Sequence, residues 1–149
     1  MFLYETHVHS LTGSACGQCT PQEIVKAYKQ AGYAGLILTD HFINGNTSVP
    51  RELDWETRMN MYYDAYLDAK EEGEKLDFDV FFGSEHHYGK GKEILIYRID
   101  LDFLLAHPEL NTARIEEYAD LVHEYGGILV HAHPHRMRDY IVPDIAPRY

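Results

Sequence analysis

The chain has 149 residues, enough for one domain with a buried core, and its 45% hydrophobic and 25% charged residues are typical of globular proteins. The formal net charge is −11 and there is no basic cluster, which argues against duplex nucleic acid as a partner, because its phosphates require a basic surface. No apolar run approaches the roughly 18 residues of a membrane span and no signal peptide is visible, so we expect a cytoplasmic protein that does not bind membranes.

Apolar segments of strand length alternate with segments of helical periodicity. Residues 2–6 form the first expected strand. A helix is expected to begin at Thr20-Pro21-Gln22-Glu23, because Thr20 can cap it, Pro21 suits its first position and Glu23 completes a capping box; Gly32 ends it. This alternation predicts a single α/β domain, residues 1–149, with parallel strands. Further strands are expected at residues 35–39, 79–82, 93–99 and 128–130, and further helices at residues 51–73 and 111–125.

Polar side chains follow four of these strands where each strand ends. The carboxyl ends of parallel strands share one edge of a sheet or barrel, and active sites are assembled at that edge. Four strand ends with the same kind of side chain therefore predict one common site. The polar residues at these ends are His7 and His9, Asp40 and His41, Glu85, and His131 and His133.

These residue types suit a metal ion. In His7-Val8-His9 the two imidazoles lie on one side of an extended chain, because side chains repeat every second residue. A mixture of imidazole and carboxylate ligands favours zinc, manganese or iron over magnesium or calcium, which prefer oxygen ligands. A carboxylate such as Glu85 can bridge two ions, which together bind a phosphoryl group and activate a water molecule for attack. No serine or cysteine nucleophile is then needed.

Four motifs together resemble the first motifs of the PHP (polymerase and histidinol phosphatase) superfamily, in the family's order and over nearly the whole chain. The resemblance implies a distorted seven-stranded (β/α) barrel, two or three divalent metal ions (zinc, manganese or iron) and phosphoesterase activity. The motifs are Glu5-Thr6-His7-Val8-His9-Ser10, Ile37-Leu38-Thr39-Asp40-His41, Gly83-Ser84-Glu85 and Val130-His131-Ala132-His133-Pro134.

On this resemblance we predict a metal-dependent hydrolase that attacks a phosphomonoester or phosphodiester with a metal-activated water. The substrate is expected to be a small phosphorylated molecule, and Arg136 is placed to bind its phosphate. Catalytic roles are assigned to Asp40, Glu85 and His133. The residues that match the family's metal ligands are His7, His9, His41, Glu85 and His133.

Some positions depart from the family pattern. The loop after the first His-x-His motif has no Asp or His, so a ligand there is either absent or is Cys16. Cys16 and Cys19 can also be read as free thiols in a loop of a protein from a reducing compartment. Glu93 stands roughly where many members have a histidine ligand, and its role is left open.

Three further histidines have ambiguous positions. His131 is either a packing residue or a neighbour of the metal ligands. His86 and His87 are adjacent in the sequence, so on an extended strand their side chains point to opposite faces. At most one of these two histidines can then face the site.

The family ends its site with an Asp-x-His motif on a late strand, and this sequence stops at Tyr149 without it. A complete barrel needs about 200 residues or more, so we expect a C-terminally truncated, open barrel of about five parallel strands. Its unpaired edge should lead to a homo-oligomer or be covered by residues 134–149. Two other functions stay open: an amidohydrolase-like hydrolase of amides or esters, and a catalytically incomplete domain that binds metal.

Overall fold

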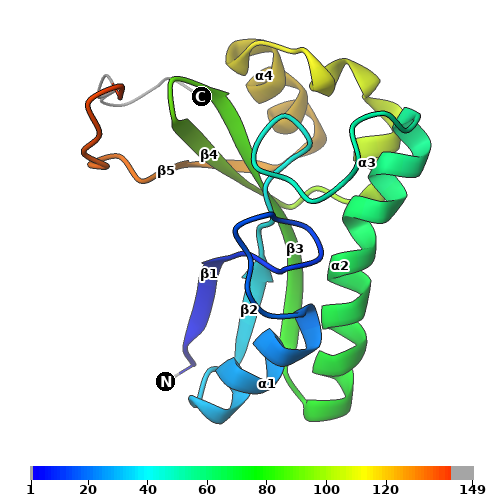
Figure 1. The fold of residues 1–149 in the computed structure, drawn as a ribbon. Coiled ribbons are helices and arrows are strands. Elements are labelled where there is room, and N and C mark those ends of the chain that lie inside the picture. Colours follow the sequence, from blue (N-terminus) through cyan, green and yellow to red (C-terminus); the bar gives the residue numbers. More distant parts are fainter. Residues whose placement is uncertain (1, 142–149) are drawn as a thin grey trace.

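The computed structural model describes residues 2–141, which form one five-stranded sheet with helices packed on one of its faces (Figure 1). The strands cross the sheet in chain order, from β1 at one edge to β5 at the other. The elements are β1 (Tyr4–Val8), α1 (Pro21–Gln30), β2 (Gly35–Leu38), α2 (Trp55–Leu76), β3 (Asp79–Gly89), β4 (Lys92–Tyr97), α3 (Leu101–Ala106), the 3-10 helix η1 (Pro108–Asn111), α4 (Ile115–Tyr125) and β5 (Ile128–Ala132).

The sheet is mixed in direction. β1, β2 and β3 run parallel, whereas β4 runs antiparallel to both β3 and β5. The expectation of an all-parallel sheet is therefore wrong, although the α/β class and the open, curled sheet of five strands agree with an incomplete barrel. Because β4 alone is reversed, β1, β2, β3 and β5 still run in one direction, and their carboxyl ends point to the same edge.

A tight hairpin explains the reversed strand. β3 continues beyond the residues 79–82 expected for it and turns at Lys90 and Gly91, whose φ angles are both positive (52° and 70°). A two-residue turn of this kind joins antiparallel neighbours, whereas parallel strands need a long crossover. The hairpin also brings Glu93 opposite His87.

Local capping interactions set the helix boundaries. The predicted capping box of Thr20 and Glu23 is present at the start of α1. α2 begins later than residue 51, because the Asp54 side chain accepts a hydrogen bond from the Thr57 backbone N–H (3.0 Å) and so fixes the first turn. α3 was not predicted, since a helix of six residues is too short to show a periodic pattern. Within residues 2–141, no helix is both long and apolar enough to cross a bilayer.

The hydrophobic core lies between the sheet and the helices. Val25 of α1, Leu36 of β2 and Ala69 of α2 pack in one cluster, and Ile96 of β4 packs with Tyr118 of α4 in a second. The described residues leave the opposite face of the sheet uncovered: Phe81, Ile128 and Val130 are 51%, 45% and 43% exposed. Only one face of the sheet is therefore fixed by helix packing in this part of the chain.

The buried hydroxyl of Tyr118 yields a test of this packing. Its ring is 0% exposed against Phe42 and His86, and its hydroxyl has no hydrogen-bond partner among residues 2–141. Burying an unpaired hydroxyl destabilises a protein, so Tyr118→Phe should raise the free energy of unfolding by about 1 kcal/mol in urea denaturation. The control is Tyr62→Phe, because the Tyr62 hydroxyl donates to the Asp40 carbonyl and contacts Ser84 Oγ. Equal losses of stability in both variants would contradict the assignment.

Candidate metal centre

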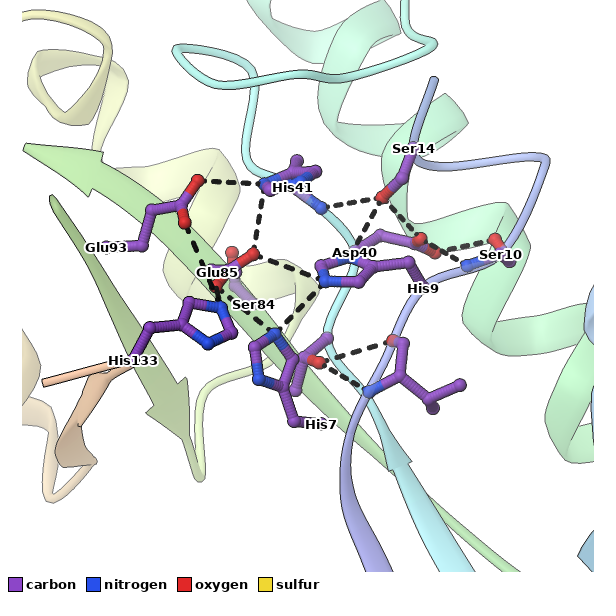
Figure 2. A network of polar contacts seen from close by, with 12 residues as sticks. His7, His9, Ser10, Ser14, Asp40, His41, Ser84, Glu85, Glu93 and His133 are labelled. Atoms are coloured by element: carbon purple, nitrogen blue, oxygen red, sulfur yellow. Dashed lines mark hydrogen bonds and ion pairs between the residues drawn. The ribbon is translucent and has the colours of Figure 1, made fainter. Parts of the chain in front are cut away.

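The centre of the site is the Glu85 carboxylate on β3, which is 0% exposed and lies among four imidazoles (Figure 2). Its Oε1 lies 3.2 Å from His7 Nε2 and 3.3 Å from His133 Nε2. Its Oε2 lies 3.3 Å from His9 Nε2 and 3.0 Å from His41 Nδ1. Each carboxylate oxygen therefore faces a different pair of histidines.

The direction of the strands explains why these side chains meet. His7 lies on β1 and His9 just beyond it, and His41 follows β2 and forms a parallel bridge with Glu85. His133 follows β5 with a positive φ of 50°, a backbone conformation that is uncommon for a residue other than glycine. Four strands that run the same way thus bring their carboxyl ends to one edge, as the sequence predicted.

Three buried polar atoms of the cluster lack hydrogen bonds. Among residues 2–141, neither oxygen of Glu85 nor Nδ1 of His41 has a hydrogen-bond partner, although all three atoms are buried. The contacts at 3.0 to 3.3 Å between these groups are close but not aligned as hydrogen bonds. A buried carboxylate without donors is costly, and a cation between it and the imidazole nitrogens removes that cost. The residues therefore fit a metal ion.

His9 is held in the neutral form that binds metal. Burial lowers the pKa of His9 to about 4, since the attraction of Glu85 is outweighed by burial and by the neighbouring histidines. Burial would raise the pKa of Glu85, but His7, His41 and His9 more than offset it and the pKa is lowered. At neutral pH the imidazole of His9 is thus uncharged and the Glu85 carboxylate is ionised.

Ser14 fixes which nitrogen of His9 carries the proton. Ser14 Oγ–H donates to Asp40 Oδ1 (2.7 Å), and Ser14 Oγ accepts from the His41 backbone N–H (2.8 Å). With its one proton used, Ser14 Oγ can only accept from His9 Nδ1, which lies 3.3 Å away. Nε2 of His9 then carries the lone pair; it lies 3.0 Å from His7 Nε2, from which it can accept, and 3.3 Å from Glu85 Oε2, at the position where a metal ion would bind.

The Asp40 carboxylate is hydrogen-bonded to the loop that contains Ser10 and Ser14. It accepts from the Ser10 backbone N–H (2.6 Å), from Ser10 Oγ–H (2.7 Å) and from Ser14 Oγ–H. Burial raises the pKa of Asp40, and the bonds from Ser10 and Ser14 oppose that rise. These contacts make Asp40 a positioning residue for the loop that carries His9 (Figure 2). Its predicted catalytic role stays a prediction.

Glu93 and Arg136 complete one wall of the site. Glu93 of β4 is buried, with Oε1 3.7 Å from His41 Nδ1 and Oε2 4.0 Å from His133 Nε2. Arg136 Nη1 donates to Glu93 Oε2 at 2.8 Å. The sequence left Glu93 unassigned because the hairpin that brings it here reverses the strand.

A cavity of about 730 Å³ opens over the cluster and is bounded by His9, His41, Glu85, Glu93, His133 and Arg136, among others. His87 also lines it, whereas His86 is buried against Phe42 and Tyr118, where burial lowers its pKa to about 3. The prediction that at most one of these two histidines faces the site is therefore confirmed. His131 Nε2 lies 3.1 Å from the Tyr88 hydroxyl, as a packing residue would.

Comparisons with known proteins identify the fold. No protein-family model and no curated protein matches the chain. A two-domain protein from Bacteroides vulgatus, described as containing a predicted PHP-like metal-dependent phosphoesterase, aligns over 99% of this chain and 39% of its own length, with a TM-score of 0.71 and 14% identity. This chain shares its fold with a PHP-like phosphoesterase structure. The resemblance expected from the sequence is thus confirmed for the fold.

Two other structures align over less of the chain. A candidate metal-dependent phosphoesterase from Bifidobacterium adolescentis aligns over 74% of this chain and 31% of its own, with a TM-score of 0.48 and 15% identity. An amidohydrolase from Chromobacterium violaceum, solved with sulfate and no metal, aligns over 69% and 31%, with a TM-score of 0.49 and 21% identity. This chain therefore spans less than half the length of each of these proteins.

Metal content tests this cluster directly. Replacing His7 and His9 together by alanine removes one imidazole from each side of Glu85, so most of the bound zinc or manganese should be lost. The measurement is metal per chain by elemental analysis after desalting. His123→Ala is the control, because His123 is exposed on α4. An unchanged metal content in the double variant would mean that the site has been assigned wrongly.

Proposed function

We propose that this chain is a metal-dependent hydrolase of phosphomonoesters or phosphodiesters. The observation that carries the proposal is the position of Glu85, whose two oxygens each face a separate pair of histidines. A carboxylate in this position can bridge two cations, and paired cations are a recurrent device for phosphoryl chemistry.

The proposed ligands form two sets. His7, His133 and Glu85 Oε1 would hold one ion, and His9, His41 and Glu85 Oε2 would hold the other. Glu93 lies near the second set. Ligand atoms of His41, Glu85 and Glu93 lie within 4.8 Å of one another, and so do those of His7, His9 and Glu85, which join the two sets. Imidazole and carboxylate ligands favour zinc, manganese or iron.

The remaining side chains would bind and orient the substrate. When bound, the metal ions supply Lewis-acid stabilisation of the phosphoryl oxygens and an activated water. Arg136 uses one N–H on Glu93 and keeps the other donors of its guanidinium for a phosphate in the cavity. Ser10 and Ser14 are committed to Asp40, so neither is free to act as a nucleophile. Glu85 and His133 are retained as proposed catalytic residues, whereas Asp40, which was also predicted to be catalytic, is proposed to position the loop that carries His9.

The partners that we propose follow from the net charge of the chain and from the unpaired edges of its sheet. A net charge of −11 favours a small phosphorylated substrate over duplex nucleic acid. In the described part of the chain, β1 and β5 each have one edge without a strand partner. Because an unpaired edge is a template for pairing, a homo-oligomer is also proposed.

A second candidate function is metal binding without turnover. The sheet face that residues 2–141 leave uncovered supports it, because in this part of the chain no element packs over the exposed Phe81 and Val130. Catalysis requires reacting groups to be held within fractions of an ångström.

Turnover separates the two candidates. With zinc or manganese supplied, the chain should hydrolyse p-nitrophenyl phosphate or bis(p-nitrophenyl) phosphate. Glu85→Gln should lower kcat on the order of 100-fold or more, because the neutral amide cannot bridge two cations. If a protein with two bound ions per chain shows no turnover, the second candidate, metal binding without catalysis, is supported.

The role of Arg136 can be tested in the same assay. Arg136→Ala should raise KM by about tenfold, the scale of one lost charge-assisted hydrogen bond, with a smaller change in kcat. Arg138→Ala is the control, since Arg138 is exposed and does not line the cavity over the cluster. An unchanged KM in Arg136→Ala would assign Arg136 to the support of Glu93 alone.

A further inference from the structure

We propose that the thiolate of Cys16 is a ligand of the ion held by His9 and His41, and that it makes this half of the cluster selective for zinc over manganese. The inference rests on the proposed metal centre but not on its phosphoesterase activity. On binding, the Cys16 S–H bond is broken, its proton passes to solvent and a sulfur–metal bond forms.

The ligand atoms are already close together. Cys16 Sγ and one ring nitrogen each of His9 and His41 lie within 4.8 Å of one another, and all three residues line the same cavity. Neighbouring donors around a tetrahedral zinc ion are roughly 3.5 Å apart. Because Cys16 is exposed, its side chain is free to rotate and close the remaining distance.

The loop backbone holds Cys16 at the cavity wall. Ala15 N–H donates to the Asn46 carbonyl (2.9 Å), and Gly17 N–H donates to the Ser14 carbonyl (2.9 Å). A Cβ added to Gly17 would lie 2.1 Å from the Ser10 carbonyl oxygen, so only glycine fits there. Both sequence neighbours of Cys16 are thus held in place. The hydrogen bonds between Asp40 and this loop would keep His9 and Cys16 close to each other.

His41 supplies independent evidence of a ligand at this position. It is only 8% exposed, and its Nδ1 has no hydrogen-bond partner among residues 2–141. That nitrogen lies 3.0 Å from Glu85 Oε2 and 3.7 Å from Glu93 Oε1, and a ring nitrogen of His41 lies within 4.8 Å of Cys16 Sγ. A buried nitrogen beside two carboxylates and a thiol is the environment that a cation completes.

The second cysteine behaves differently. Cys19 is also an exposed free thiol, but it is neither in the groups of metal-ligating atoms nor among the residues that line the cavity. Sulfur ligands favour zinc, whereas manganese prefers oxygen. The half of the cluster with His7 and His133 has no cysteine in reach in the described structure, so the two halves should differ in metal preference.

Cobalt substitution tests the proposal. Cobalt(II) bound to a thiolate has a near-ultraviolet sulfur-to-metal charge-transfer band, which imidazole and carboxylate ligands do not produce. The full chain and Cys19→Ser should show this band, and Cys16→Ser should lack it. Zinc affinity should fall by at least about tenfold in Cys16→Ser, with manganese affinity changed much less. In Cys19→Ser, zinc should also protect the remaining thiol from a thiol-specific reagent.

Three results would overturn the inference: a band that persists in Cys16→Ser, cobalt binding without any band in the unaltered chain, or no cobalt binding at all. Failure of the phosphoesterase proposal is a separate outcome. A charge-transfer band without hydrolysis would support Cys16 as a ligand and contradict the phosphoesterase proposal. Hydrolysis without the band would support the phosphoesterase proposal and show that Cys16 is a free thiol.

Discussion

The burial of the Glu85 carboxylate is the constraint on which the rest of the site depends. A charge that is 0% exposed must be compensated, and no Lys or Arg contacts it among the described residues. Its neighbours are imidazoles, and burial lowers the pKa of one of them, His9, so that it is neutral. Neutral imidazoles stabilise a buried carboxylate poorly unless a cation lies between them. The buried carboxylate therefore fits a cation for electrostatic reasons, before any question of catalysis arises.

The fold supplies this cluster in spite of its mixed sheet. Reversal of β4 at Lys90 and Gly91 leaves the strands that carry the histidines running in one direction, so their carboxyl ends remain together. It also adds Glu93 from the amino end of the reversed strand, which an all-parallel sheet would have placed at the far edge. This one hairpin therefore reverses the direction of β4 and also adds Glu93 to the proposed ligands.

The sequence was sufficient for the cluster but not for its surroundings. His7, His9, His41, Glu85 and His133 could be grouped because polar residues at strand ends depend only on local pattern and strand direction. The role of Asp40 could not be read, because it depends on hydrogen bonds with Ser10 and Ser14 across 30 and 26 residues. The hairpin was missed because Lys90 is an unusual residue at a positive φ angle.

The charges of the proposed centre bear on which phosphoester it suits. Glu85, Glu93 and a Cys16 thiolate contribute three negative charges, against four from two divalent ions and one from Arg136. The loaded cavity then carries an excess of two positive charges, and water screens it only in part because Glu85, Glu93 and His41 are buried. A phosphomonoester dianion neutralises this excess, whereas a phosphodiester carries a single negative charge. With the activated water counted as neutral, electrostatic complementarity favours the monoester, and the match is closest when sulfur, rather than a neutral ligand, completes the half of the cluster at His41.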